Sequence, residues 1–484
     1  MAKKEREGTE WGMIASGEGA NKIAIQYLSE FKSKYMSDRI LLLNTTASDI
    51  RPEKAFGSRI NPEFQSILQK IKKEKTCIFG GAPSGAGNVW KIGEDEATKD
   101  FETIRRYFAN SQLAQADVVL GLATLGGGTG NGSLPYVISQ LKSKTTTGAQ
   151  GNYISLGIWP LDSEASQRHF NAICGFTRLL RYGPNGKRNS DLVIIVHNSK
   201  VAELIGDASA NPPDKYYLIN LEIIKAMDMM VAPSGKASEA TIDVADYYQL
   251  PTSFGVYHFT PCISWDNDPK VIGLEAGLEL ALRSPMCPME EKTATMAYFI
   301  VRAPEKHIKN GTFTQERLEE VARKLSLKFM AGSHGGLVRY CSLNSKEGEG
   351  FDAMVLLGGF SLKKLLSGSI GKFKAFSENL RRGPGDTLEL TDDEHPNIRA
   401  AIKPGELETI ERWLREYSKK TEDLIEKAKK GGPAEEEMLE GWMEEGKALK
   451  ETPAAPIEKK PTQSAKQAKS IKPAKPAKQA LKKG

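Results

Sequence analysis

The 484-residue chain has no apolar run approaching the roughly 20 residues that a transmembrane helix needs. Its first residues, MAKKEREGTEW, are charged but are not followed by an apolar stretch, so they do not resemble a secretory signal. The five cysteines form no CxxC pair and the six histidines form no HExxH motif. These absences argue against membrane, disulfide-rich and zinc proteins, and we expect a cytoplasmic protein with reduced thiols.

An excess of charge of one sign is missing over most of the chain. The net charge is +6, but the last 34 residues, 451–484, hold nine lysines against two acids. This segment therefore carries +7 and the preceding 450 residues carry −1. The segment consists mainly of Lys, Ala, Pro, Gln and Ser, which cannot bury a core, so we expect a disordered basic tail. Arguments about partners that rest on charge apply to this tail alone.

Lysines recur at every third position of the tail from Lys466 to Lys478. Pro473 and Pro476 prevent a continuous helix, and a polyproline II ribbon with three residues per turn would align these lysines along one edge. Such a ribbon suits phosphates or an acidic protein surface, with binding that weakens steeply as salt is added. The alternative is a tail that only keeps the chain soluble.

Short apolar runs alternate with helical patterns over the first 200 residues. Runs that are apolar throughout are typical of strands buried on both faces, and the alternation predicts an α/β fold with a parallel, doubly wound sheet. The expected strands are Met13–Ala15, Ile40–Asn44, Thr76–Phe79, Asp117–Leu122, Tyr153–Ile158 and Leu192–His197. The expected helices are Asn21–Lys34, Asp95–Gln112, Leu134–Leu141 and Glu164–Arg181.

A helix over Asn220–Val231 precedes a second set of strands, which predicts a smaller α+β domain. Its expected elements are strands at Gly255–Phe259, Thr295–Val301, Leu337–Leu343 and Met354–Leu357 and a helix near Glu316–Leu325. Charged helices are expected at Gly405–Lys430 and Pro433–Lys450. We therefore predict four parts, with boundaries at 1–232, 233–380, 381–450 and 451–484.

Three glycine-rich loops follow predicted strands, at Ser16–Asn21, Ser84–Asn88 and Gly126–Ser133. Glycine lets backbone N–H groups approach an anion, and sheets of this kind bind ligands at the carboxyl ends of their strands. A lone G-x-G loop is more often just a tight turn. Three such loops on one sheet edge favour a bulky polyanion, such as a nucleoside triphosphate with its metal ion.

None of these loops completes GxGxxG, because Lys22, Trp90 or Ser133 occupies the third glycine position, and no GxxxxGK[ST] motif occurs. Both departures argue against dinucleotide and Walker-type sites. A dinucleotide-dependent metabolic enzyme stays open as an alternative, although the acid expected about 20 residues after the loop is missing.

The loop Gly126–Ser133, GGGTGNGS, resembles the GGGTG[ST]G signature of the tubulin/FtsZ superfamily. Gly17–Ile23 (GEGANKI) and Ser84–Gly93 (SGAGNVWKIG) resemble the first and third phosphate loops of tubulins. The resemblance covers roughly residues 12–360 and implies a GTPase that binds GTP with Mg²⁺. The loop residues that it implies as nucleotide contacts are Gly17, Gly19, Ala20, Asn21, Gly85, Ala86, Gly87, Asn88, Gly126, Gly127, Gly128, Thr129 and Gly130.

The resemblance also assigns nucleotide contacts outside the loops. Glu164 and Arg168 match the family's ribose and phosphate contacts, with an ordinary i,i+4 helix pair as the alternative. Asn198 and Asn220 match the positions that hold guanine, and Tyr216 matches the position that stacks on it. An Asn amide can donate and accept along a purine edge, and an aromatic ring supplies a stacking face.

An acidic segment, Ile242–Asp246, resembles the family's synergy loop, with Thr241 where the family usually has Asn. The resemblance implies that Asp243 and Asp246 polarise the attacking water in the pocket of the next subunit, so that hydrolysis requires head-to-tail assembly. The alternative is a pair of surface acids that cap a helix. No metal site built from protein ligands is expected.

The sequence leaves open the roles of two further acidic features. Glu18 departs from the family pattern, since a carboxylate near phosphates repels them unless it helps to hold a cation. Asp266 and Asp268 form a second acidic cluster near the synergy-loop segment.

The C-terminal helices and the lysine-rich tail make the chain look most like TubZ within this superfamily. That resemblance implies GTP-driven filaments that segregate plasmid DNA, with the tail bound to a TubR-like adaptor assembled on the plasmid centromere. No membrane partner is expected. An FtsZ-like filament for cell division or cell shape is the alternative.

Overall fold

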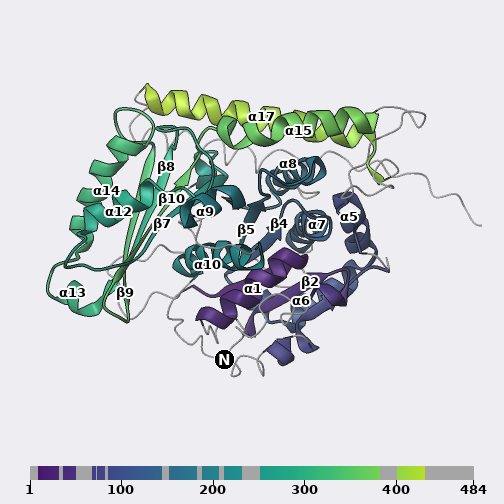
Figure 1. Cartoon of the computed structure of the whole chain (residues 1–484), viewed down its shortest axis with the longest axis horizontal. Coiled ribbons are helices and arrows are strands. Elements are labelled where there is room, and N and C mark those ends of the chain that lie inside the picture. The colour runs from purple at the N-terminus through teal and green to yellow at the C-terminus, as the bar shows by residue number, and fades with distance from the viewer. Residues whose placement is uncertain are drawn as a thin grey trace, which may run out of the picture.

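One ten-stranded sheet runs through the chain (Figure 1). The computed structural model describes residues 9–31, 36, 38–50, 68–71, 73–81, 85–143, 152–181, 188–206, 212–231, 251–381 and 401–430. Within these ranges the strand order is β3-β2-β1-β4-β5-β6-β7-β10-β8-β9.

The first six strands are all parallel, which confirms the predicted doubly wound sheet. Alternate residues of the central strand β1 enter different cores: Ile14 packs on one face of the sheet, and Met13 and Ala15 pack on the other. Burial on both faces explains the uninterrupted apolar runs. The six strands are β1 (Trp11–Ser16), β2 (Ile40–Asn44), β3 (Thr76–Ile78), β4 (Val118–Thr124), β5 (Asn152–Trp159) and β6 (Leu192–His197).

Helices cover both faces of this parallel part. One face carries α1 (Glu18–Phe31), α9 (Asn198–Ile205) and the core helix α10 (Pro212–Val231). The other face carries α5 (Trp90–Lys99), α6 (Phe101–Asn110), α7 (Thr129–Ser143) and α8 (Ser166–Leu180). The described ranges of this part also include two short 3₁₀ turns, η1 (Ala47–Asp49) and η3 (Leu113–Gln115).

The rest of the sheet is mixed. In it β7 (His258–Asn267), β10 (Phe351–Gly358) and β8 (Met296–Pro304) are antiparallel neighbours, and β9 (Val338–Lys346) runs parallel to β8. The described helices of this part include α12 (Leu274–Leu282), α13 (Glu305–Lys309) and α14 (Gln315–Phe329). Two residue pairs, Val193–His258 and Ile194–Phe259, join β6 to β7, so the sheet continues across the predicted boundary at residue 232.

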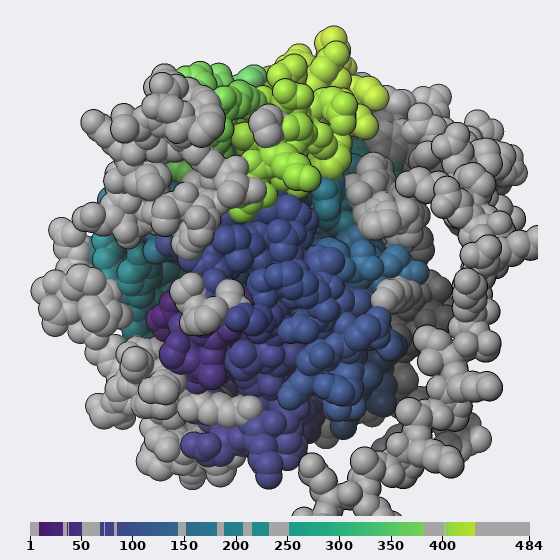
Figure 2. Space-filling model, turned by 90° about the vertical axis from the view of Figure 1, so that its right-hand side faces the viewer, coloured from purple at the N-terminus to yellow at the C-terminus, as the bar shows by residue number. Residues whose placement is uncertain are grey.

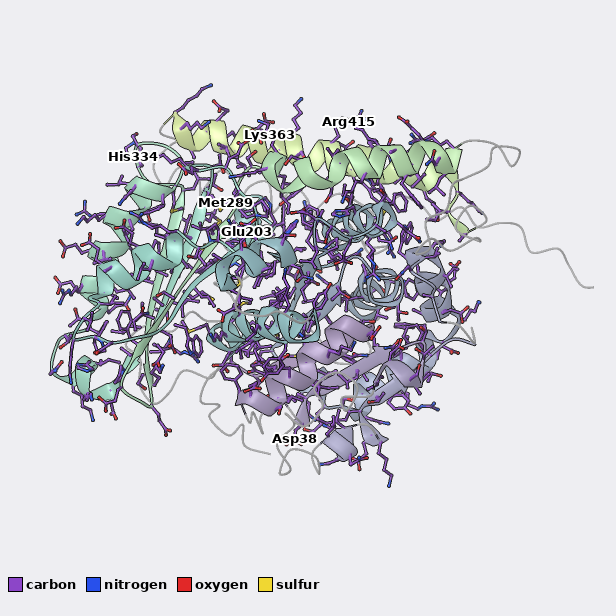
Figure 3. All side chains as sticks on the ribbon, in the orientation of Figure 1. Asp38, Glu203, Met289, His334, Lys363 and Arg415 are labelled. Carbon is purple, nitrogen blue, oxygen red and sulfur yellow. The ribbon has the colours of Figure 1, made fainter. Side chains whose placement is uncertain are left out.

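Two C-terminal helices, α15 (Lys363–Arg381) and α17 (Pro404–Lys429), lie side by side along one edge of the molecule (Figure 1). Figure 3 labels Lys363 and Arg415 on them, far from Asp38 at the opposite edge. Seen from the side, α17 lies above the purple and blue N-terminal residues (Figure 2). The C-terminal end of α17 packs Ile425 and Ala428 against Ala331. The pair therefore bridges the two halves of the sheet.

Several predicted boundaries were wrong. The helix expected at 95–112 is two helices that break at Asp100, whose carboxylate accepts a hydrogen bond from the Gly80 N–H at 2.6 Å. The strand expected at 255–259 begins only at His258, and α12 and α15 were not predicted. The helix expected at 433–450 and the tail lie outside the described residues. None of the helices in the described ranges is long and apolar enough to cross a bilayer.

Candidate functional site

A cavity of about 830 Å³ opens at the carboxyl ends of the parallel strands. This volume suits a ligand of nucleotide size. Sixteen of the eighteen predicted nucleotide contacts line it, and they come from loops and helices that are far apart in the sequence. They are Gly17, Gly19, Gly85, Ala86, Gly87, Asn88, Gly126, Gly127, Gly128, Thr129, Gly130, Glu164, Arg168, Asn198, Tyr216 and Asn220.

The other two predicted contacts, Ala20 and Asn21, lie beneath the cavity and are fully buried. The Asn21 side-chain amide donates to the main-chain oxygen of Leu43 at 3.2 Å. Asn21 therefore ties the start of α1 to the end of β2 and supports the first loop from below.

The first loop and the signature loop pack directly on each other. Gly17 has φ +84°, a conformation that favours glycine, and a Cβ at Gly130 would overlap the main-chain oxygen of Ser16. The hydroxyls of Ser16 and Ser133 are 2.6 Å apart. Because α7 begins at Thr129, its free N–H groups and positive dipole end face the cavity, as an anion requires.

Helix α8 holds the third loop and the signature loop together. The main-chain oxygen of Asn88 accepts hydrogen bonds from the amides of Gln167 at 2.9 Å and Asn171 at 2.7 Å. Asn171 also donates to the main-chain oxygen of Gly126 at 3.0 Å. Gln167 and Asn171 are fully buried, and their spacing of four places both on one face of the helix.

About two turns further along that face, Arg178 holds the first turn of α7. Its guanidinium donates to the main-chain oxygens of Asn131 and Gly132 at 3.0 and 3.1 Å, pairs with Glu94, and stacks 4.4 Å from the ring centre of Trp90. Arg178 is 1% exposed. This buried cation is therefore satisfied by the loop it supports.

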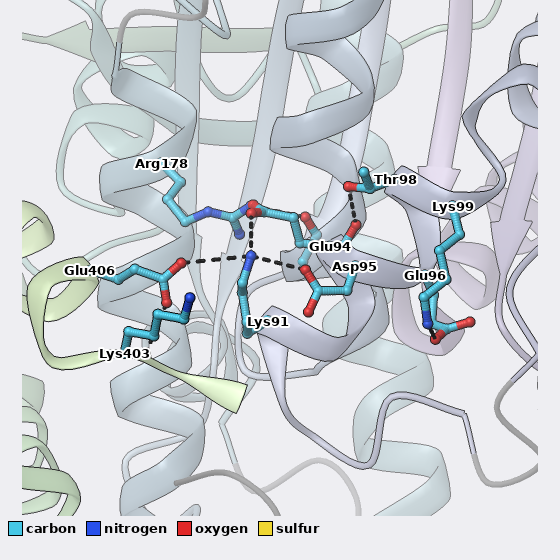
Figure 4. A network of polar contacts seen from close by, with 10 residues as sticks. Lys91, Glu94, Asp95, Glu96, Thr98, Lys99, Arg178, Lys403 and Glu406 are labelled. Carbon is cyan, nitrogen blue, oxygen red and sulfur yellow. Dashed lines mark hydrogen bonds and ion pairs between the residues drawn. The ribbon is translucent and has the colours of Figure 1, made fainter. Parts of the chain in front are cut away.

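The ion pair of Arg178 and Glu94 belongs to a network of charged side chains that reaches the C-terminal helices (Figure 4). Lys91 lies 3.1 Å from Glu94, 2.9 Å from Asp95 and 3.6 Å from Glu406 on α17. A chain of charges thus connects the signature loop to α17.

The predicted ribose and base contacts line another side of the cavity, and they come from the turn after β5 and from α8, α9 and α10. Glu164 lies 3.2 Å from Arg168, and it sits in the turn before α8, which begins at Ser166 rather than at 164 as expected. Asn198 is the first residue of α9. Tyr216 is 41% exposed, which leaves its ring available for stacking, and partial burial followed by the charge of Glu164 raises its pKa.

Sequence reasoning missed part of the cavity wall. Thr45, Thr46 and Asp49 line it directly after β2, and Thr45 lies 2.9 Å from the Thr129 hydroxyl. The polar run TTASD behind the apolar run ILLLN was the available signal. The structure also pairs Glu18 with Lys22 at 2.5 Å, which offsets the negative charge of Glu18 at the cavity.

The predicted catalytic acids Asp243 and Asp246 lie outside the described residues. The second acidic cluster does not line the cavity. Instead, the Asp266 N–H donates to Asp352 at 3.0 Å, and the Asp268 carboxylate accepts from the Lys270 N–H at 2.9 Å. Both residues stabilise the turn at the end of β7.

Comparison with curated proteins finds homologues among archaeal FtsZ and CetZ proteins, whereas no protein-family model matches the chain. The cell division protein FtsZ of Methanothermobacter thermautotrophicus is 30% identical over 220 residues, which are 44% of this chain and 51% of that protein. FtsZ 1 of Methanocaldococcus jannaschii is 26% identical over 291 residues, 58% of this chain and 71% of that protein. The match thus spans about half of the first relative and nearly three quarters of the second.

Solved structures give the same result for the fold. A GTPγS-bound protofilament of CetZ2 from Haloferax volcanii aligns with a TM-score of 0.57 at 17% identity, over 76% of this chain and 99% of that one. An FtsZ dimer from M. jannaschii aligns with a TM-score of 0.52 at 19% identity, over 72% and 88%. The chain therefore has the tubulin/FtsZ fold and is a distant member of the tubulin/FtsZ superfamily, with FtsZ and CetZ proteins among its homologues.

Proposed function

We propose that this chain is a cytoplasmic GTPase that assembles head to tail into filaments. The observation that carries the proposal is the cavity, which unites three glycine loops, a carboxylate–arginine pair and an Asn–Tyr–Asn set. These groups match the phosphates, the ribose and the purine base in turn. GTP is the substrate, and the relatives bound to GTPγS or named FtsZ support that choice.

Phosphate binding in this proposal is the work of backbone donors. The N–H groups of residues 127–130 and the Thr129 hydroxyl face the β- and γ-phosphates, and no Walker-type lysine is needed. In the described part of the chain, no three His, Cys, Asp or Glu side chains gather as metal ligands. Mg²⁺ would be held mainly by phosphates and water, with Asp49 in the wall as an outer partner, and would neutralise phosphate charge.

Hydrolysis would use acids of the neighbouring subunit. Asn220 lines the cavity, and α10 continues from it to Val231, about 16 Å further along the helix axis at 1.5 Å per residue. Val231, the last described residue before Asp243 and Asp246 in the chain, thus lies well away from Asn220 and the chain's own pocket. A head-to-tail contact is heterologous and does not close, so it produces filaments.

For the cellular role we favour a division or cell-shape filament over plasmid segregation. The relatives are named cell division protein FtsZ and tubulin-like protein CetZ. Plasmid segregation through a TubR-like adaptor rests on the basic tail, which lies outside the described residues, and none of these comparisons supports it.

The test is GTP turnover per subunit against protein concentration, with and without EDTA, for wild type, Asp246→Ala and the control Asp268→Ala. We expect turnover to begin at the concentration where polymer can be pelleted, and to need Mg²⁺. Asp246→Ala should polymerise without hydrolysis, and Asp268→Ala should behave like wild type. Turnover that is independent of concentration and survives Asp246→Ala would show that each subunit carries a complete site.

A further inference from the structure

We propose that Lys372 on α15 positions the turn that presents Glu164 to the nucleotide, and thereby sets the preference of the site for ribose over deoxyribose. This inference rests on the proposed function. It concerns a residue far outside the loops that line the cavity, on a helix near the C-terminal end of the described chain.

The turn that carries Glu164 is closed by its own hydrogen bonds. The Glu164 carboxylate accepts from the Leu161 N–H at 2.8 Å, and the Glu164 N–H donates to the Leu161 main-chain oxygen at 3.0 Å. One carboxylate oxygen is thus used to hold the turn, and the other lies 3.2 Å from Arg168. The direction of the carboxylate therefore depends on the backbone of residues 161–164.

The ammonium group of Lys372 fixes that backbone from outside. It donates to the main-chain oxygen of Asp162 at 2.6 Å, to the main-chain oxygen of Glu164 at 3.3 Å, and to Nε2 of His169 at 2.9 Å. An ammonium group has three protons, so these three acceptors use all of them. A cation bound to two carbonyls of one turn holds that turn more firmly than neutral donors would.

His169 is suited to this arrangement because it is neutral. Burial lowers its pKa, and the charge of Lys372 lowers it further. With Nε2 as acceptor, Nδ1 carries the proton and donates to the Ser369 hydroxyl at 2.7 Å, which also accepts from the Trp159 indole at 2.9 Å. The imidazole, which is fully buried, thereby fixes the position of the Lys372 amine.

Helix α15 does not depend on Lys372 for its place. Phe170 of α8 stacks on Phe373 with ring centres 5.4 Å apart and contacts Phe376 at 4.9 Å. All three rings are buried. Removal of the Lys372 amine should therefore release the turn while the two helices stay packed.

The experiment is calorimetric titration with GDP, 2′-deoxyGDP and 3′-deoxyGDP, which avoids hydrolysis. The variants are Lys372→Met, the conservative Lys372→Arg, and Lys374→Met, an exposed lysine two residues along the same helix. We expect wild type and Lys374→Met to bind GDP about tenfold more tightly than at least one deoxy form, which corresponds to about 1.4 kcal/mol for the lost polar contact. Lys372→Met should bring that ratio close to one, and Lys372→Arg should restore part of it.

Amide hydrogen exchange without nucleotide gives a second measurement. The amides of residues 161–164 should exchange faster in Lys372→Met than in Lys374→Met. A Lys372→Met variant with the wild-type affinity ratio and unchanged exchange would overturn the inference, as would a wild type that binds GDP without preferring ribose. A wild type that binds no guanine nucleotide would instead contradict the proposed function.

Discussion

The guanidinium of Arg178 donates to the main-chain oxygen of Asn131 at 3.0 Å, and so a side chain near the end of α8 holds the first turn of α7. The side-chain amides of Gln167 and Asn171, on the same face of α8, hold the neighbouring loops. The backbone donors proposed to bind phosphate are thus fixed by buried side chains that never touch the ligand. This explains how loops rich in glycine can be rigid enough to present N–H groups.

Arg178→Met should lower the free energy of unfolding by about 3–5 kcal/mol, because it leaves the carboxylate of Glu94 and two loop carbonyls without their buried partner. Denaturation by urea measures the loss. The matched control is Arg105→Met, which removes the exposed pair with Glu102 and should cost less than about 1 kcal/mol. Equal effects of the two substitutions would show that the buried network does not stabilise the fold.

Gly130→Ala should weaken guanine-nucleotide binding by at least about tenfold, since the added methyl group overlaps the Ser16 carbonyl and separates the two loops. Calorimetric titration with GDP measures it. Gly371 on α15 has open space around its Cβ position, so Gly371→Ala should leave binding intact and raise stability by about 0.5–1 kcal/mol. Unchanged affinity in Gly130→Ala would mean that the loops tolerate separation.

Glu18→Gln should strengthen GDP binding by about threefold to tenfold, because it removes a negative charge from the cavity and leaves Lys22 without its partner. Lys22→Met should act in the opposite direction. Titrations at low and high salt should show the difference shrinking as salt is added. If Glu18→Gln instead bound GDP more weakly than wild type, and did so only in the presence of Mg²⁺, the result would assign Glu18 a part in holding the ion.

Stability should fall in mild acid because of His258. Burial lowers its pKa from 6.5 to about 4, while its Nε2 donates to the Phe360 oxygen and its Nδ1 accepts from the Tyr417 hydroxyl. Between pH 6.5 and 4 the unfolded chain binds a proton that the folded chain does not, so the free energy of unfolding decreases as the pH falls. From this residue the loss is about 2 kcal/mol at pH 5.

Urea denaturation at pH 7 and pH 5 tests this, with His258→Gln and the exposed His334→Gln as the variants. The difference between the two pH values should shrink in His258→Gln and keep its wild-type size in His334→Gln. A pH dependence that is the same in all three proteins would place the acid sensitivity elsewhere.

The sequence predicts the cavity well where function depends on the backbone. The run GGGTGNGS can be recognised in the sequence because the glycines that must lie against Ser16 and against the third loop are close together in the chain. Strand ends are equally visible as apolar runs that stop at a polar residue. Whether the residues that line the cavity bind GTP stays a prediction.

The supporting side chains were not predictable in the same way. Gln167 and Asn171 bind the Asn88 carbonyl across 79 and 83 residues of sequence, and a buried amide has no periodic signature. Helix α15 was missed because KKLLSGSIGKFKAFSENLR contains glycines and serines that lower helix propensity. Its stability comes from Phe373 and Phe376 against α8, which is a tertiary contribution.

The narrow junction between β6 and β7 is a mechanically weak line in the sheet. Only two residue pairs join these strands, whereas β5 and β6 share six. Twist or shear between the halves of the sheet therefore breaks fewest hydrogen bonds along this line. The helices α15 and α17 cross this line and reinforce it, because Glu406 is anchored on one side and Ala428 on the other. A load across this line would therefore be carried by these two helices as well as by the sheet.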